Sequence, residues 1–418
     1  MMVATEAFQV DVPLTPKAPT LAEIKASKLG NGIRIISKDG GSGTVSLSFA
    51  IMCGSSAESL SEQGSSKLLS MAAFGGSADK SGLRICRDLE NSGATFSASS
   101  DRSKITYSVT CLADKADEVF GVIAGAINSP IESNRYYVLD EDAKETAKIV
   151  ADAHGADAAA QVTDLLMEAA YGENTAMGKP EYAPSLPKLS AEEVMAFRAA
   201  NFTSGNLIVS ASGLPFNSLK SMTECYFHGM PESSGKPVLG GSSYTGGDMK
   251  VRVEMDGETY MGLAFPNSNN TAATQILVSK LEAKVGSMGF KKGALSTFHS
   301  DGLFGFYAKG EPAAATQAIE AAVAELKTMS SNAGVTDGDK AKVTLSNFLK
   351  LEGQDASITL IESAISGVAP EAAADVRKVT SADVSAAAKA ALGAVPSFAV
   401  YGTTAGTPSF ATVAKMLK

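Results

Sequence analysis

The order of predicted elements is repeated in the two halves of the chain, and this repeat limits the possible folds more than any other feature. Residues 229–247, GMPESSGKPVLGGSSYTGG, are rich in Gly, Ser and Pro and show no periodic apolar pattern, which is typical of a linker. They divide the 418 residues into two nearly equal parts. Each part opens with two alternating runs that predict strands, over 32–37 and 45–52 in the first part and over 249–255 and 259–265 in the second.

A helical stretch, a second pair of strands and a long Ala-rich helix follow in both parts. The Ala-rich helices are expected over 113–128 and 312–328. The repeat therefore predicts an α+β protein of two homologous units, 1–228 and 248–418, in each of which helices cover a mainly antiparallel sheet.

Smaller signals agree with this scheme. A shift of 200 residues places Ser100-Asp101 over Ser300-Asp301 and Tyr107 over Tyr307. Capping boxes predict a helix start late in each unit, at Ser190–Glu193 and at Thr380–Asp383.

Charge and cysteine content argue against several classes of protein. Lys and Arg number 36 against 45 Asp and Glu, so the net charge is -9 and the chain lacks the positive field that nucleic-acid binding requires. No C-x-x-C pair occurs, and we expect reduced, buried cysteines rather than a zinc knuckle or a redox site. The four cysteines are Cys53, Cys86, Cys111 and Cys225.

We expect no membrane span, because the longest uncharged apolar stretch, 119–131, is well short of the roughly 20 residues that a spanning helix needs. The N-terminal residues show neither a signal peptide nor an Arg-rich transit peptide, although a presequence removed before Met1 would leave no trace.

Catalytic patterns are almost absent. The nucleophile elbow and the phosphate loop are missing, and Ser77–Lys80 matches S-x-x-K without its companion motifs. We interpret the acidic runs 140–142 and 192–193 as solvated helix starts. The three histidines lie in different stretches, and no two have the i, i+4 spacing of zinc ligands on one helix. They are His154, His228 and His299.

The segment 62–74, EQGSSKLLSMAAF, resembles the motif region of a known family. Pitrilysin-type zinc peptidases, which include the mitochondrial processing peptidase and the core proteins of respiratory complex III, carry a Gly, two small residues and H-x-x-E-H on the first helix after the second strand. The five positions here read Lys67-Leu68-Leu69-Ser70-Met71. By this resemblance, Lys67 replaces the first ligand, Ser70 the general base and Met71 the second ligand.

These replacements predict that the zinc chemistry is lost. Protonated Lys67 has no lone pair to donate, Met71 offers only a soft thioether, and Ser70 cannot take a proton from zinc-bound water. The third ligand of active members would fall in the helix expected over 141–154, where Glu145 is nearby, but one carboxylate cannot hold the metal alone. We therefore expect no catalytic, metal-binding or cofactor-binding residue.

The resemblance covers nearly the whole chain. Residues 172–206 resemble the segment that closes the first unit, and 402–417 resemble the end of the second core protein of complex III. Residues 298–307, FHSDGLFGFY, are similar to the strand Y-S-D-S-G-L-F-G-F-Y of that protein. The stretch that would correspond to the glycine-rich loop of the processing peptidase alpha subunit, 283–295, has only three glycines, Gly286, Gly289 and Gly293.

The resemblance implies a structural role within complex III, ubiquinol-cytochrome c reductase, in which other subunits hold the haem, iron-sulfur and quinone chemistry. It implies a peripheral, matrix-facing subunit of the mitochondrial inner membrane that pairs with core protein 1, or with a processing peptidase beta-like subunit, in a dimeric complex. The alternative is the non-catalytic alpha subunit of the processing peptidase, which handles presequences, and one chain can hold both roles. A stand-alone enzyme is the third hypothesis.

Overall fold

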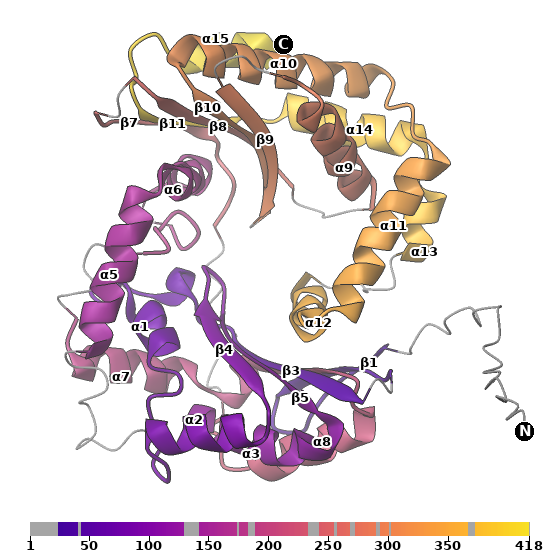
Figure 1. Cartoon of the computed structure of the whole chain (residues 1–418). Helices are drawn as coiled ribbons and strands as arrows, with labels where there is room; N and C mark the ends of the chain where they lie inside the picture. Colours follow the sequence, from indigo (N-terminus) through magenta and orange to yellow (C-terminus); the bar gives the residue numbers. More distant parts are fainter. Residues whose placement is uncertain are drawn as a thin grey trace, which may run out of the picture.

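Two β-sheets face each other across the molecule, and helices cover both of them (Figure 1). The computed structural model describes residues 24–40, 43–128, 142–173, 175–182, 189–232, 242–254, 257–267, 272–289, 293–300, 302–366 and 373–417. Part of the expected linker, 233–241, lies outside the described residues, as do the acidic residues Asp140 and Glu141 and the repeat position Asp301.

The first sheet has six strands in the order β1-β2-β6-β3-β5-β4. Neighbouring strands are antiparallel except β2 and β6, which are parallel. The strands are β1 Ile24–Lys28, β2 Arg34–Lys38, β3 Thr44–Ile51, β4 Thr95–Ser100, β5 Ile105–Leu112 and β6 Leu207–Ser212.

The second sheet repeats this arrangement with five strands in the order β7-β11-β8-β10-β9. Its single parallel pair, β7 with β11, matches β2 with β6, and only β1 has no counterpart. The strands are β7 Gly247–Arg252, β8 Thr259–Pro266, β9 Gly293–Ser300, β10 Leu303–Gly310 and β11 Ser397–Gly402. The predicted α+β duplication with mainly antiparallel sheets is therefore confirmed.

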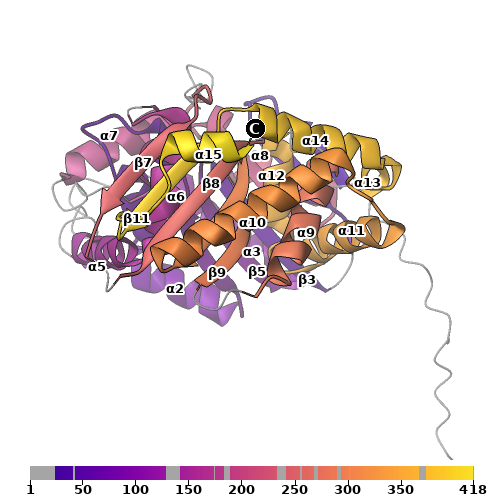
Figure 2. The same ribbon diagram turned by 90° about the horizontal axis from the view of Figure 1, so that it is seen from above.

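Helices lie on the outer faces of both sheets, and others run along the sides of the molecule between the two halves (Figures 1 and 2). We call the apolar cluster on the outer side of each sheet its outer core. The helices of the first half that contribute to the outer core of the first sheet are α1 Ser65–Met71, α2 Gly82–Asn91, α3 Ala116–Asn128, α5 Asp142–Ala156, α7 Ala191–Asn201 and α8 Phe216–Tyr226. Those of the second are α9 Ala272–Gly286, α10 Pro312–Ser331, α11 Asp337–Glu352, α13 Ala373–Lys378, α14 Ser381–Gly393 and α15 Phe410–Leu417. The expected Ala-rich helices correspond to α3 and α10.

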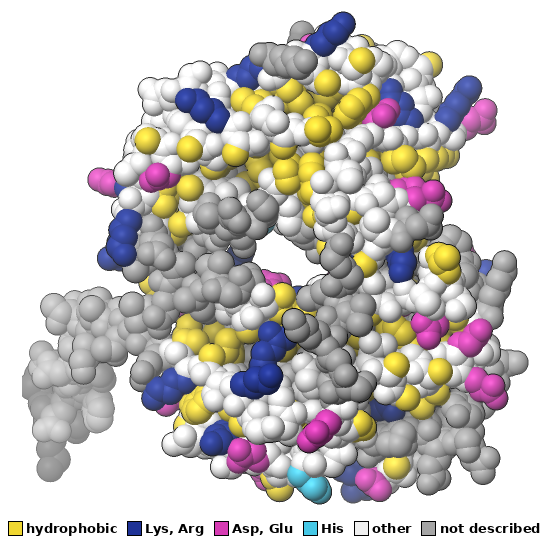
Figure 3. Space-filling view, turned by 180° about the vertical axis from the view of Figure 1, so that it is seen from behind, with side chains coloured by type: hydrophobic (Ala, Val, Ile, Leu, Met, Phe, Trp, Pro, Cys, Tyr) yellow, Lys and Arg dark blue, Asp and Glu magenta, His cyan; other side chains and the backbone are white. Residues whose placement is uncertain are grey.

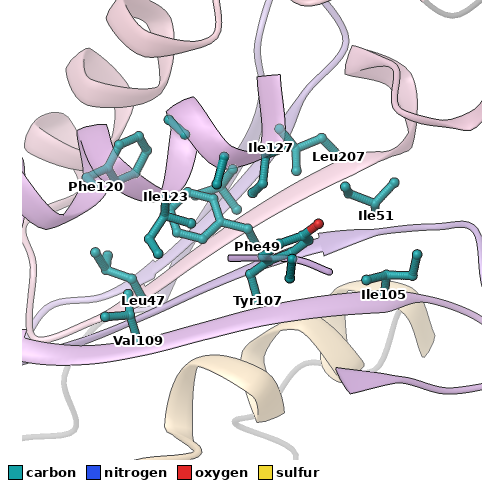
Figure 4. Close-up of a cluster of buried hydrophobic side chains, with 14 of the residues drawn as sticks. Leu47, Phe49, Ile51, Ile105, Tyr107, Val109, Phe120, Ile123, Ile127 and Leu207 are labelled. Carbon is teal, nitrogen blue, oxygen red and sulfur yellow. The ribbon is translucent and has the colours of Figure 1, made fainter. Parts of the chain in front are cut away.

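Strand alternation creates the outer core of the first sheet. Leu47, Phe49 and Ile51 of β3 point toward α3, where the ring of Phe49 meets that of Phe120 edge-on with centroids 4.9 Å apart (Figure 4). The intervening β3 residues face the other side of the sheet, because successive side chains of a strand point in opposite directions. The second sheet packs in the same way against α9, α10 and α14.

Each half of the chain contributes one helix that packs on the inner face of the other half's sheet. Helix α6, Ala158–Tyr171, comes from the first half but packs on β7, β8 and β11 of the second sheet. Helix α12, Ala356–Ser366, comes from the second half but packs on β2, β3 and β6 of the first sheet. Each sheet thus buries part of its inner face under a helix from beyond the linker region.

One sequence correspondence is wrong. Tyr107 belongs to the outer core of the first sheet, whereas Tyr307 lies on the inner face of the second sheet beside α6. Strand β10 faces its outer core with Phe304, Phe306 and Ala308, so an even shift of 200 lays the core side of β5 over the inner side of β10. A strand that slips by one residue turns its side chains to the opposite face.

Both predicted capping boxes are confirmed, with Ser190 and Thr380 as the N-caps. The cysteines differ from expectation: Cys53 and Cys111 are buried, but Cys86 is half-buried and Cys225 is exposed at the end of α8. Among the described residues, no helix combines the length and the apolar character needed to cross a bilayer.

Candidate functional site

Helix α1 carries residues 67–71, which resemble a zinc motif with its ligands replaced, and a buried carboxylate fixes its first turn. Glu58 is only 3% exposed. Its side chain accepts hydrogen bonds from the backbone N–H of Gly64 at 2.7 Å and from the N–H and hydroxyl of Ser66 at 2.8 and 2.6 Å. Gly64 has φ of +96°, which favours glycine. Burial raises the pKa of Glu58, while these hydrogen bonds partly oppose the shift.

Lys67, at the position of the first metal ligand, is engaged by an aromatic side chain. Its ammonium donates to the hydroxyl of Tyr182 at 2.7 Å and lies 4.2 Å from the centroid of that ring. The ring of Tyr182 in turn stacks on His154 of α5, with centroids 4.2 Å apart. The ammonium is therefore used as a donor and as a cation against a ring, and a protonated amine has no lone pair for a metal.

The other two motif positions also make structural contacts. The Ser70 hydroxyl donates to the carbonyl of Lys67 at 2.8 Å and lies 3.3 Å from the hydroxyl of Ser100. Met71 is half-buried and packs against the outer core of the first sheet. Neither side chain can replace the carboxylate or the imidazole that the motif requires.

A charged network continues from His154 into the interior. Its Nε2 lies 2.7 Å from one oxygen of Asp164 on α6, and the buried guanidinium of Arg102 donates to the other oxygen. Burial raises the pKa of Glu181, while the positive charges of Arg102 and Lys67 partly offset that shift. The network links α1, α5, α6 and the loop between β4 and β5.

A pocket of about 460 Å³ adjoins this network between α5, α6 and residues 178–182. Its polar lining comprises Lys148, Asp152, His154, Gln161, Asp164, Glu168 and Tyr182. Burial raises the pKa of Glu168, and the neighbouring Glu173 and Asp164 raise it further. The pocket therefore mixes both charge signs.

The remaining candidate residues lie apart. Glu145, near the expected third ligand, is exposed on α5. His228 follows α8, and His299 lies on β9, where its Nε2 is 2.7 Å from the side-chain amide nitrogen of Asn267. Within the part of the chain that the structure describes, no three His, Cys, Asp or Glu side chains come together as metal ligands. The residues present do not fit a zinc ion.

The S-x-x-K match is also accounted for by structure. The Lys80 ammonium donates to the carboxylate of Asp88 at 2.8 Å, and the Ser77 hydroxyl accepts the backbone N–H of Lys80. The lysine that would have to activate the serine is thus held in an ion pair.

Sequence reasoning missed Tyr182, Arg102 and Asp164. Tyr182 is 115 residues from Lys67, and no local pattern signals their contact. Asp164 precedes Glu168 by one helical turn of α6, which could have indicated an acidic face but not its partners.

Comparison with known proteins agrees with the fold. The model of the insulinase family of peptidases, family M16, matches residues 34–184. The chain is 27% identical to the probable mitochondrial-processing peptidase subunit alpha-1 of Arabidopsis thaliana, over 82% of this chain and 73% of that protein.

Two further relatives are similar over almost their whole length. Identity is 25% with mitochondrial-processing peptidase subunit alpha-2 of Dictyostelium discoideum, over 94% of this chain and 95% of that protein. It is 26% with cytochrome b-c1 complex subunit 2 of Rattus norvegicus, over 95% of this chain and 92% of that protein. The chain thus combines the duplicated fold with similarity to the insulinase family of peptidases over residues 34–184, and with similarity to these relatives along nearly its whole length.

Proposed function

We propose that this chain is a non-catalytic core subunit of mitochondrial complex III, with a structural role in assembly and stability. The observation that carries the proposal is the state of the motif helix, where Lys67, Ser70 and Met71 stand at the positions of the two ligands and the general base. Lys67 is bound to Tyr182 instead of facing an open coordination site. The fold is kept while the residues for its ancestral reaction are absent from α1.

The proposed role includes a place and partners. Relatives named as cytochrome b-c1 complex subunit 2 are similar along nearly the whole chain. The chain would be a peripheral subunit on the matrix side of the inner membrane, paired with core protein 1 or a beta-like relative in a dimeric complex. The two units are proposed to correspond to 1–228 and 248–418, joined by 229–247.

The experiment is a native gel of mitochondrial membranes dissolved in a mild detergent, with the chain carrying an epitope tag. Co-migration with the haem-bearing complex III, and loss of that band when the chain is depleted, is the expected result. Migration as a free chain or as a small haem-free heterodimer would contradict the proposal.

The second candidate is the presequence-handling alpha subunit of the processing peptidase, and relatives with that name favour it. The test mixes the purified chain with a catalytic beta subunit that carries an intact H-x-x-E-H and with a fluorescent presequence peptide. Cleavage that requires this chain would support a presequence role. Cleavage unaffected by this chain leaves the structural role alone.

A further inference from the structure

The two exchanged helices rest on chemically different surfaces. The inner face of the second sheet under α6 is apolar and aromatic. It presents Ala264, Leu303 and Ala399 around Val162 and Leu166, with tyrosines packed against them. The tyrosines that pack against this cluster are Tyr260, Tyr307 and Tyr401 of the strands, Tyr244 before β7 and Tyr171 at the end of α6.

The inner face of the first sheet carries rows of hydroxyl groups instead. Strand register places Ser212, Ser46, Thr110 and Thr95 side by side across β6, β3, β5 and β4. The next row comprises Ser210, Ser48, Ser108 and Ser97. Directly opposed residues of neighbouring strands point to the same face. Thr95 and Ser97 are exposed and Ser108 and Thr110 are half-buried, so part of this face already lies open.

Hydrogen bonds through these hydroxyls hold the first turn of α12. Ser357 is fully buried, and its hydroxyl lies 2.8 Å from that of Ser46 and 2.8 Å from that of Ser48. The Ser210 hydroxyl donates to the carbonyl of Ser357 at 2.7 Å, and that of Ser46 donates to the carbonyl of Gln354 at 2.6 Å.

Apolar contacts of α12 are confined to small clusters. Ile361 packs with Ala50, Met52 and Ile208, and Leu360 packs with Ile36 and Leu351.

Release of the two helices would therefore differ in free energy. When α12 leaves the sheet, water can replace the hydrogen-bond partners of the hydroxyls that become exposed, so each of these bonds contributes little net free energy. Exposure of apolar surface is unfavourable in proportion to its area, and water gives no such replacement to the apolar side chains under α6.

From this difference we propose that α12 separates from the first sheet more readily than α6 separates from the second sheet. The two halves of the chain then open by separation of α12 from the first sheet. Opening exposes the hydroxyl face between the sheets, where the surface is already hollowed in the view of Figure 3. The inference does not depend on the role in complex III.

Hydrogen exchange followed by mass spectrometry on the full chain tests the proposal. Amides in the interior of α12 should exchange by local opening at least tenfold faster than those in the interior of α6. Equal rates in the two helices, or faster exchange in α6, would overturn it.

A variant sharpens the test. The triple substitution S46A, S48A and S210A removes the hydroxyls under α12, and exchange in α12 should accelerate about tenfold or more while α6 is unchanged. A matched control, S97A with S99A, removes hydroxyls of the same face that α12 does not cover, and should alter neither helix. The proposal fails if the triple substitution accelerates hydrogen exchange equally in both helices, or if the variant does not fold. Either result would mean that α12 separates from the sheet only when the whole chain unfolds.

Discussion

Gly262 provides the sharpest test of the helix exchange. It lies in β8 beneath α6, and a Cβ atom added there would be 2.5 Å from Leu166 Cδ1 and 2.9 Å from Val162 Cγ1. Carbon atoms in contact prefer about 3.5–4.0 Å, so in Gly262→Ala the buried side chains of Leu166 and Val162, or α6 with them, would have to shift by about 1 Å. Overpacking of this kind costs about 1–3 kcal/mol. The lower entropy of the unfolded alanine chain returns about 0.4–1 kcal/mol, and the variant should remain destabilised.

The matched control is Gly125→Ala in α3, where an added Cβ meets nothing within 4 Å. Alanine in a helix interior is better than glycine by about 0.5–1 kcal/mol, so this variant should be stabilised. Urea unfolding of the full chain, followed by circular dichroism, should show a lower midpoint for Gly262→Ala and a higher midpoint for Gly125→Ala. An increase for both would mean that α6 does not pack on β8.

Three further predictions concern the motif region and a helix cap. Glu58→Ala leaves the donors of Gly64 and Ser66 without their acceptor, and should lower the free energy of unfolding by about 1–3 kcal/mol in urea titrations. Lys67→Met should increase hydrogen exchange around 178–182, whereas Tyr182→Phe, which keeps the ring, should have a smaller effect on the same amides. Burial of the Asp339 carboxylate acts to raise its pKa, but hydrogen bonds from Lys280 and Thr336 outweigh this effect and lower the pKa below its ordinary value of 3.8. A carboxyl group whose pKa is lower in the folded state stabilises the fold at pH values above its unfolded-state pKa. This stabilisation is lost as the pH falls through the folded-state pKa. Asp339→Ala should therefore destabilise by about 1 kcal/mol at pH 7 and by less near pH 3, as measured by urea midpoints at the two pH values.

Local patterns predicted the elements because their causes are local. The alternation over 45–52 became β3 with Leu47, Phe49 and Ile51 on the core side, since strand side chains alternate in direction. The boxes at Ser190 and Thr380 became helix starts because a hydroxyl three residues before a carboxylate satisfies free backbone donors. A third box, at Thr336 and Asp339, has the same pattern and was not predicted.

Long-range partners could not be predicted in the same way. An apolar stripe on α6 shows that the helix is buried, but both sheets offer an inner face, and the sequence does not distinguish them. The offset that separates Tyr107 from Tyr307 is a single residue, and three shared residues cannot reveal it. At the site, the replaced motif at 67–71 was visible in the sequence, whereas the contact of Lys67 with Tyr182 required the fold.

The zinc content of the purified chain tests the central claim most directly, namely that the peptidase fold persists here without its metal chemistry. The full chain is incubated with excess zinc, desalted and analysed by elemental mass spectrometry. A peptidase of the insulinase family with an intact H-x-x-E-H serves as the positive control. We predict far less than one zinc per chain, with the control fully loaded. One tightly held zinc per chain, lost on substitution of residues around Lys67, would contradict the account.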